Sequence, residues 1–301
     1  MALPEVGFIG LGAMGRGMAL NLAKTAETLY ASDLSKDALK ILTDAGAVAC
    51  ASPAEVAKKT KIILICVPDA PQVRQIMFGK GGLAEAGESG LTVVDCTTMD
   101  RTDAIDIHRE ADEKGIDYWD CPVSGLPRRA ADGTLTIMFG GSGQAFGLAK
   151  PFLDTCGSNV IHCGDIGAGQ MMKALNNVIY NINIAGICEL LPLAIKAGLD
   201  PELVLELVTS GSSRSFASEH FAPRIYEGKF DDDFPMAWAY KDILNMQKVA
   251  VEHKAMTPVM NAMTAIYQAA MAEGYGPNPK SSMIKVYEKA LGVQFRKENK
   301  S

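Results

Sequence analysis

The sequence lacks the marks of several protein classes. None of its seven cysteines forms a C-x-x-C pair and its four histidines do not cluster, so we expect no metal site and a reducing compartment. No long basic stretch occurs among 29 basic and 35 acidic residues, which argues against a nucleic acid partner. The N-terminus carries no basic leader, and no apolar run reaches the roughly 18–20 residues of a bilayer span. We therefore expect a cytoplasmic protein without membrane contact.

The order of apolar and polar segments predicts two domains of different kinds. A chain of 301 residues is longer than a typical single domain. Up to about residue 163, short apolar runs alternate with longer amphipathic stretches, which predicts parallel β/α units. After Gly164 the pattern becomes helical. The predicted fold class is α/β, with a Rossmann-type, doubly wound sheet at residues 1–164 and an all-α domain at 165–301, joined by a long interdomain helix.

The predicted elements follow from the same patterns. Strands are expected at 6–9, 28–32, 62–67, 91–95, 117–121, 135–139 and 160–162. The long helix is expected to run from near Gly167 past Lys196, and further helices at 201–209, 239–252 and 258–272. Gly198, Gly211 and Pro223 are expected to break helices.

A glycine-rich turn follows the first predicted strand. It reads Gly10-Leu11-Gly12-Ala13-Met14-Gly15 and leads into a helical apolar stripe. The first glycine allows the tight turn, the second lets the backbone approach a pyrophosphate, and the third permits close packing of helix on strand. The N-terminus of the following helix faces the anion. This turn predicts a dinucleotide site made by residues 10–15.

Other strand ends complete the predicted cofactor site. Asp33 lies 18 residues after Gly15, near the spacing of an acid that binds the ribose 2′-hydroxyl. A carboxylate there accepts a bond from a hydroxyl but repels a 2′-phosphate, so NAD is favoured, with NADP as the alternative because Lys36 is nearby. Val67-Pro68 and Thr97-Thr98 follow the next strands, where ligands bind in such sheets. We expect them to line the cofactor crevice.

Candidate catalytic groups stand at the start of the long helix. Lys173 and Asn177 are four residues apart and share one face. An isolated lysine is usually a surface residue, yet this one stands in an apolar and small-residue stretch that carries no further charge before Glu189. Lysine serves as a general acid or base when it is desolvated. Ser124-Gly125 follows another strand and offers a hydroxyl and backbone amides, suited to a carboxylate.

The ordered motifs resemble the β-hydroxyacid dehydrogenase family, which includes 3-hydroxyisobutyrate dehydrogenases and tartronate semialdehyde reductases. The resemblance covers essentially the whole chain. The matching segments are GFIGLGAMGRGMALNLAK, DCTT, DCPVSG, DGTLTIMFGG, GAGQMMKALNN and KDILNM.

The resemblance implies roles for single residues. The family's lysine at Lys173 is the acid/base, and its asparagine at Asn177 binds substrate. Its Ser-Gly at Ser124-Gly125 holds the substrate carboxylate. The lysine at Lys241 closes over the cofactor, and Thr97 matches a hydroxyl residue near the nicotinamide. The metal-free reaction implied is reversible hydride transfer between NAD(P) and a small 3-hydroxy acid or its semialdehyde.

Leu126 departs from the family pattern, which has a second glycine at this position. Its side chain is expected to narrow or reshape the carboxylate pocket. Arg128 and Arg129 are either partners of an additional anionic group or solvated side chains, the second being the commoner state of arginine. Asn176 stands where the related 6-phosphogluconate dehydrogenases carry histidine, so decarboxylation is not expected.

Two other functions remain as alternatives. Imine reductases resemble this architecture, but they usually lack a lysine at the position of Lys173. A non-catalytic NAD(P)-binding interaction module is the second alternative, because fold alone does not fix function. The apolar long helix and the Met-rich region 256–271 further predict self-association, and the resemblance implies a homodimer or homotetramer. Loops at 210–216 and 234–238 are expected to shape the substrate pocket, whose ligand the sequence does not identify.

Overall fold

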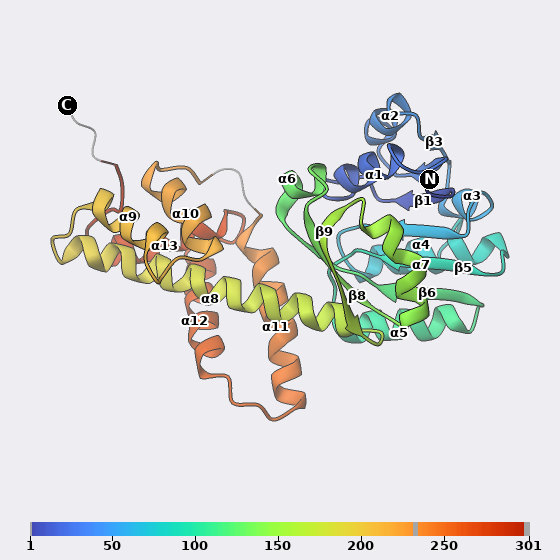
Figure 1. Ribbon diagram of the computed structural model, residues 1–301. Helices are drawn as coiled ribbons and strands as arrows, with labels where there is room; N and C mark the ends of the chain where they lie inside the picture. The colour runs from blue at the N-terminus through green and yellow to red at the C-terminus, as the bar shows by residue number, and fades with distance from the viewer. Residues whose placement is uncertain (1, 231–233, 298–301) are drawn as a thin grey trace. The chain divides into compact units, whose positions relative to one another are not determined.

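A computed structural model describes residues 2–230 and 234–297 of the chain (Figure 1). The chain divides into two compact units, Met1–Lys173 and Ala174–Ser301. The long helix α8 (Ala168–Lys196) begins in the first unit and continues into the second. The start of this helix, which the sequence analysis assigned to the second domain, thus clusters with the first unit.

A nine-stranded sheet forms the centre of the first unit. Its strands are β1 (Val6–Ile9), β2 (Leu29–Ser32), β3 (Val48–Ala49), β4 (Ile62–Ile65), β5 (Leu91–Asp95), β6 (Ile116–Asp120), β7 (Val123–Ser124), β8 (Leu135–Gly140) and β9 (Gly157–Gly164). The first six lie in the order β3-β2-β1-β4-β5-β6 and all pair in parallel. This is the strand order of a Rossmann sheet, so the predicted fold class is confirmed.

The last part of the sheet is not parallel throughout. Strand β8 pairs antiparallel with β6 and β7, and parallel with β9. The expectation of parallel β/α units is therefore wrong here. Only the two-residue β7 and the six-residue helix α6 (Leu126–Ala131) separate β6 from β8. Antiparallel neighbours need no full crossover helix, so this short connection suffices.

Two hydrophobic cores cover the two faces of the sheet. Side chains alternate along each strand, so Phe8 and Leu64 belong to one core while Ile9, Ile63 and Ile65 belong to the other. The first core is completed by α1 (Gly15–Ala23), α2 (Lys36–Asp44) and α7 (Gly143–Leu153), and the second by α3 (Pro53–Ala57), α4 (Ala70–Phe78) and α5 (Arg101–Asp112). Helices on both faces make the sheet doubly wound.

The second unit is built from helices around one core in its described residues. After α8 come α9 (Pro201–Ser210), α10 (Phe216–Tyr226), α11 (Met236–Glu252), α12 (Pro258–Ala272), the 3-10 helix η2 (Lys280–Met283) and α13 (Ile284–Leu291). Pro223 lies inside α10, so the expected break there is wrong. A capping box of Ser215 and Ser218 starts this helix and favours it despite the proline.

Helix α8 bears on the expectation that the chain has no membrane contact. Its 29 residues are long and apolar enough to cross a membrane by length and composition alone. Small and polar residues interrupt its apolar run, so the sequence contains no continuous run of this length although the mean hydropathy is that of a span. The core helix of a soluble protein can have the same length and composition.

Candidate active site

The glycine turn lies at the carboxyl end of β1 and packs against the end of β4. Gly10 has φ +94°, and a Cβ atom there would overlap the carbonyl oxygen of Cys66 and the side chain of Val67. A Cβ at Gly15 would overlap the carbonyl oxygen of Gly10. Both positions therefore exclude any side chain, as the tight turn and the helix packing require.

Gly12 differs from its neighbours because its side-chain position is open. No atom lies within 4 Å of the place that its Cβ would take. Helix α1 begins three residues later, and its N-cap residue Met14 provides no side-chain cap. An uncapped helix N-terminus beside free space fits an anionic group such as the pyrophosphate of a dinucleotide. The turn thus fits the cofactor that its sequence predicts.

Asp33 reaches this turn from the end of β2. Its carboxylate accepts hydrogen bonds from the backbone N–H of Leu11 at 2.5 Å and of Ser35 at 2.7 Å. The predicted ribose-binding acid is thereby brought to the predicted pyrophosphate turn.

Val67 and Thr97 join the ends of the next two strands. The N–H of Val67 donates to the Thr97 hydroxyl oxygen at 3.1 Å. Thr97 is buried and Val67 is half-buried, whereas Pro68 is exposed. Since Gly10 packs against Val67, the ends of β1, β4 and β5 meet at one edge of the sheet.

A buried carboxylate that the sequence analysis missed supports this edge. Asp95, at the end of β5, accepts bonds from the Tyr118 hydroxyl at 2.6 Å and the Thr97 N–H at 2.9 Å. Burial raises the pKa of Asp95 to about 6, against the lowering effect of the bonds from Thr97 and Tyr118. An acid at the end of an apolar strand was the available signal, because such an acid must find buried donors.

This pKa predicts a pH dependence of stability. Because the folded pKa of Asp95 is raised from 3.8, its stabilising contribution is complete below pH 3.8 and is lost as the pH rises through about 6. A shift of this size corresponds to a loss on the order of 3 kcal/mol. In Asp95→Asn the amide keeps partners for Thr97 and Tyr118 and no longer titrates.

Urea unfolding at several pH values between roughly 4 and 7 measures this contribution. We expect the free energy of unfolding of the parent to fall relative to that of Asp95→Asn as the pH rises. Parallel curves for the two proteins would contradict the assignment.

The first turn of α8 is fastened to the same edge. Gln170 accepts a bond from the Met99 N–H at 3.1 Å and donates to the Thr97 carbonyl at 2.7 Å. Asp120, at the end of β6, accepts bonds from the N–H groups of Gly167 and Gln170. Lys173 is half-buried one turn after Gln170.

The predicted carboxylate loop shows local backbone strain. Ser124 ends β7, and Gly125 follows with φ +147°. Leu126 has φ +62°, in the left-handed region that leucine rarely adopts. A glycine, as in the family pattern, would adopt this conformation without strain. The leucine therefore holds this backbone conformation at a cost on the order of 1–3 kcal/mol.

The two arginines after this loop have other partners. The Arg128 side chain is 92% exposed and lies 3.7 Å from the carboxylate of Asp132. The Arg129 guanidinium donates to the Thr134 carbonyl oxygen. Of the two states left open by the sequence, the geometry of Arg128 is that of a solvated side chain.

In the second unit, Asn177 and the Lys241 region lie together. Asn177 on α8 donates to the Asp242 carboxylate on α11 at 2.8 Å. Lys241 is the neighbour of Asp242 and is half-buried. Asp242 belongs to the segment KDILNM, but nothing in the sequence singled it out from its neighbours. Asp242 therefore joins the candidate residues as the hydrogen-bond partner of the Asn177 amide.

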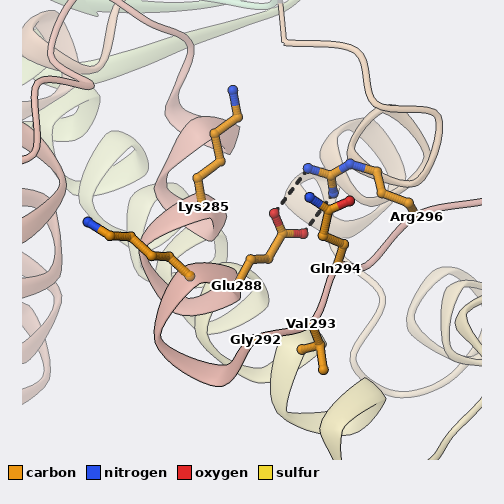
Figure 2. A pocket seen from close by; sticks show the side chains of 7 residues that line it. Lys285, Glu288, Gly292, Val293, Gln294 and Arg296 are labelled. Carbon is orange, nitrogen blue, oxygen red and sulfur yellow. Dashed lines mark hydrogen bonds and ion pairs between the residues drawn. The ribbon is translucent and has the colours of Figure 1, made fainter.

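Two cavities elsewhere contain none of the predicted site residues. The larger, about 560 Å³, lies in the second unit beside α13 (Figure 2). Its lining residues are Lys285, Glu288, Lys289, Gly292, Val293, Gln294 and Arg296. The buried carboxylate of Glu288 accepts hydrogen bonds from the Arg296 guanidinium at 2.8 and 3.1 Å. Dashed lines mark this contact in Figure 2. The second cavity, about 170 Å³, lies beside the amino ends of β5 and β6. Among the residues the structure describes, no three His, Cys, Asp or Glu side chains gather as a metal site.

Known proteins match both halves of the chain. The family described as the NAD binding domain of 6-phosphogluconate dehydrogenase matches residues 5–164. The family described as the NAD-binding region of NADP-dependent 3-hydroxyisobutyrate dehydrogenase matches residues 167–287. The 2-(hydroxymethyl)glutarate dehydrogenase of Eubacterium barkeri is 38% identical over 96% of each chain. The 2-hydroxy-3-oxopropionate reductase of Escherichia coli is 33% identical over 94% of this chain and 97% of its own.

A solved structure of a 3-hydroxyisobutyrate dehydrogenase is also similar to this chain. A 3-hydroxyisobutyrate dehydrogenase from Salmonella typhimurium has a TM-score of 0.84 and 30% identity, covering 94% of this chain and 99% of its own. The sheet order, the glycine turn and these matches define an oxidoreductase that uses a nicotinamide dinucleotide. More narrowly, the chain belongs to the β-hydroxyacid dehydrogenase family. The resemblance found in the sequence is thereby confirmed.

The imine reductase alternative has weaker support. An imine reductase from Myxococcus stipitatus has a TM-score of 0.63 but only 18% identity, which shows a common fold and nothing about activity. The two relatives described above, both over 30% identical, are a dehydrogenase and a reductase of hydroxy acids by name. Membership of this enzyme family also disfavours the non-catalytic module.

Proposed function

We propose that this enzyme catalyses the reversible oxidation of a small 3-hydroxy acid to its semialdehyde, with Lys173 as the general acid/base and NAD as the preferred cofactor. The position of Lys173 carries the proposal. Gln170, one turn earlier, is bonded to the Thr97 loop, and Thr97 is bonded to Val67, which packs against Gly10. A continuous set of contacts within the first unit therefore links the glycine turn to the turn of α8 that carries the lysine.

The chain's own groups have separate tasks in this reaction. The bound dinucleotide supplies the two-electron oxidation or reduction. The Lys173 Nζ takes the hydroxyl proton in oxidation and returns it to the alkoxide oxygen in reduction. Asn177 lies on the same face of α8 one turn on, and its amide, held by Asp242, orients the substrate hydroxyl. The Ser124 hydroxyl and the backbone N–H groups of Gly125 and Leu126 bind the substrate carboxylate.

Leu126 supports a substrate with an apolar or extended substituent. The names of the relatives specify several 3-hydroxy acids or semialdehydes, among them 2-(hydroxymethyl)glutarate and 2-hydroxy-3-oxopropionate. A leucine in place of glycine adds apolar surface beside the carboxylate loop, and this surface favours contact with a carbon substituent over a hydroxyl group. We therefore propose that the carbon next to the substrate carboxylate bears a second carbon substituent besides the hydroxymethyl group, as in 3-hydroxyisobutyrate and 2-(hydroxymethyl)glutarate, where glycerate has a hydroxyl instead.

A substrate panel with two cofactors tests this function. Oxidation of 3-hydroxyisobutyrate, 2-(hydroxymethyl)glutarate and glycerate is followed at 340 nm with NAD and with NADP in parallel. We expect turnover of one of the first two with a higher kcat/KM for NAD. In Asp33→Asn, which removes the charge that repels a 2′-phosphate, the ratio of kcat/KM for NAD over NADP falls about 10-fold or more. A lack of turnover on all three acids and their semialdehydes, or an unchanged ratio, would contradict the proposal.

We further propose that the enzyme works in the cytoplasm as a homodimer or homotetramer, without nucleic acid or membrane partners. The seven cysteines, all in the described part of the chain, are free thiols, which suits a reducing compartment. Large apolar side chains of the second unit are exposed, and such exposure favours association with a second copy. They include Leu203, Leu207, Val251, Met256 and Val259. Sedimentation at micromolar concentration measures this association, and a stable monomer would refute it.

A further inference from the structure

We propose that Asp120 and Gln170 are positioning residues that fix the first turn of α8 and thereby the direction of the Lys173 side chain. The inference rests on the proposed function of Lys173. Neither residue is assigned a contact with substrate or cofactor. Each acts through the helix that carries the lysine.

Asp120 caps α8 from a strand far away in the sequence. Its Oδ1 accepts from the Gly167 N–H at 2.6 Å and its Oδ2 from the Gln170 N–H at 2.7 Å. The first N–H groups of a helix have no partner within it, and the buried carboxylate satisfies that of Gln170 as well as the N–H of Gly167 just before the helix. Asp120 is fully buried at the end of β6, which pairs with β5 on one side and β8 on the other. The helix start is therefore tied to a rigid part of the sheet.

Two glycines allow this close approach. A Cβ at Gly140 on β8 would overlap Asp120 Oδ1. A Cβ at Gly169 in the first turn of α8 would lie 2.7 Å from Asp120 Oδ2 and overlap the Met138 carbonyl oxygen. The helix start and the sheet thus touch backbone to backbone around the carboxylate, which leaves the helix no room to slide.

Gln170 fixes the rotation of the helix about its axis. Its side chain, 2% exposed, makes two bonds with the loop after β5, to the Met99 N–H and the Thr97 carbonyl. Lys173 lies at i+3 from Gln170 and is therefore its neighbour on the helix surface. With the Gln170 side chain pinned to the Thr97 loop, the direction in which Lys173 leaves the helix is set relative to that loop.

Catalysis is sensitive to such placement. A displacement of about 1 Å at a reacting group can lower the rate ~100-fold. Loss of the two Gln170 bonds lets the first turn of α8 rotate or fray while the sheet and the glycine turn stay in place. The change should therefore appear in kcat and not in cofactor affinity.

The test uses the full-length enzyme with Gln170→Met, which keeps the volume and removes both bonds. We expect kcat, expressed per NADH-binding site, to fall about 10- to 100-fold, with the NADH Kd within about twofold of the parent value. Gln247→Met is the matched control, because Gln247 also makes a side-chain bond between two elements, to Thr264 at 2.9 Å between α11 and α12, and this bond is partly buried. It should lose stability without losing kcat.

A double variant separates positioning from general damage. If Gln170 acts through Lys173, adding Gln170→Met to Lys173→Ala causes no further loss of the residual rate. If Gln170→Met fails to fold, Gln170→Glu keeps the acceptor for Met99 and serves in its place. Asp120→Asn, which leaves one helix N–H without an acceptor, should give the same pattern.

The outcomes distinguish the two proposals. Wild-type kcat in folded Gln170→Met, or a full additional loss in the Lys173→Ala background, refutes the positioning role while Lys173 stands. Substantial activity in Lys173→Ala instead refutes the proposed function itself.

Discussion

Replacing Lys173 with alanine is expected to lower kcat/KM by ~100- to 10,000-fold, the usual contribution of a general acid/base, while NADH still binds. No other group of the chain is assigned the proton transfer, so water must replace the lysine. The cofactor affinity should survive because the glycine turn, Asp33 and the Thr97 loop make their contacts without Lys173. Steady-state rates with the substrate found in the panel, together with NADH fluorescence titration, measure both quantities.

Two controls define this result. Lys196→Ala removes an exposed lysine from the last turn of the same helix and should leave kcat unchanged. Partial recovery of Lys173→Ala by added primary amines would show that the missing group is a proton donor and acceptor. Retained turnover, or a loss of rate that merely follows a loss of NADH binding, would contradict the role of Lys173.

Gly12→Val is expected to abolish measurable NAD(H) binding in a protein that still folds. No neighbour lies within 4 Å of the Cβ position, and the φ angle of Gly12 is outside the left-handed region, so the side chain meets neither atoms nor strain in the free protein. The same side chain fills the space through which the backbone approaches the pyrophosphate. Each charge-assisted bond that is lost, worth about 2–3 kcal/mol, raises the NAD(H) Kd ~30- to 150-fold. The loss of more than one such bond makes binding unmeasurable.

Gly147→Ala provides the matched control. Gly147 lies inside α7, and its Cβ position is equally open. Alanine should stabilise that helix by roughly 0.5–1 kcal/mol without altering NADH affinity. Thermal unfolding and fluorescence titration of both variants check this pair. Normal NADH affinity in Gly12→Val, or a Tm far below that of the parent, would contradict the assignment of residues 10–15 as the pyrophosphate-binding turn.

Several features could be predicted from the sequence because they depend on near neighbours in the chain. The glycine turn, its strand and its helix lie within residues 6–23, and Asp33 follows at the end of the next strand. Lys173 and Asn177 share a face through helical periodicity alone. Local spacing and local backbone geometry therefore determined the fold class, the cofactor type and the candidate acid/base.

Other features depend on contacts between distant segments, and no local pattern records those. The antiparallel pairing of β8 with β6 and β7 follows from a short connection whose path the sequence did not reveal. The bond of Tyr118 to Asp95 joins neighbouring strands, and the bonds of Gln170 to the Thr97 loop cross from a helix to the sheet.

Leu126 shows most clearly the difference between what the sequence and what the tertiary structure reveals. The sequence revealed an unusual residue at this position, and only the tertiary structure revealed its left-handed backbone. The sequence alone determined that the chain has a glycine turn typical of dinucleotide binding, and it predicted which groups move the proton. The tertiary structure decided how they are held, because Asp120 and Gln170 meet the start of α8 only when sheet and helix have packed.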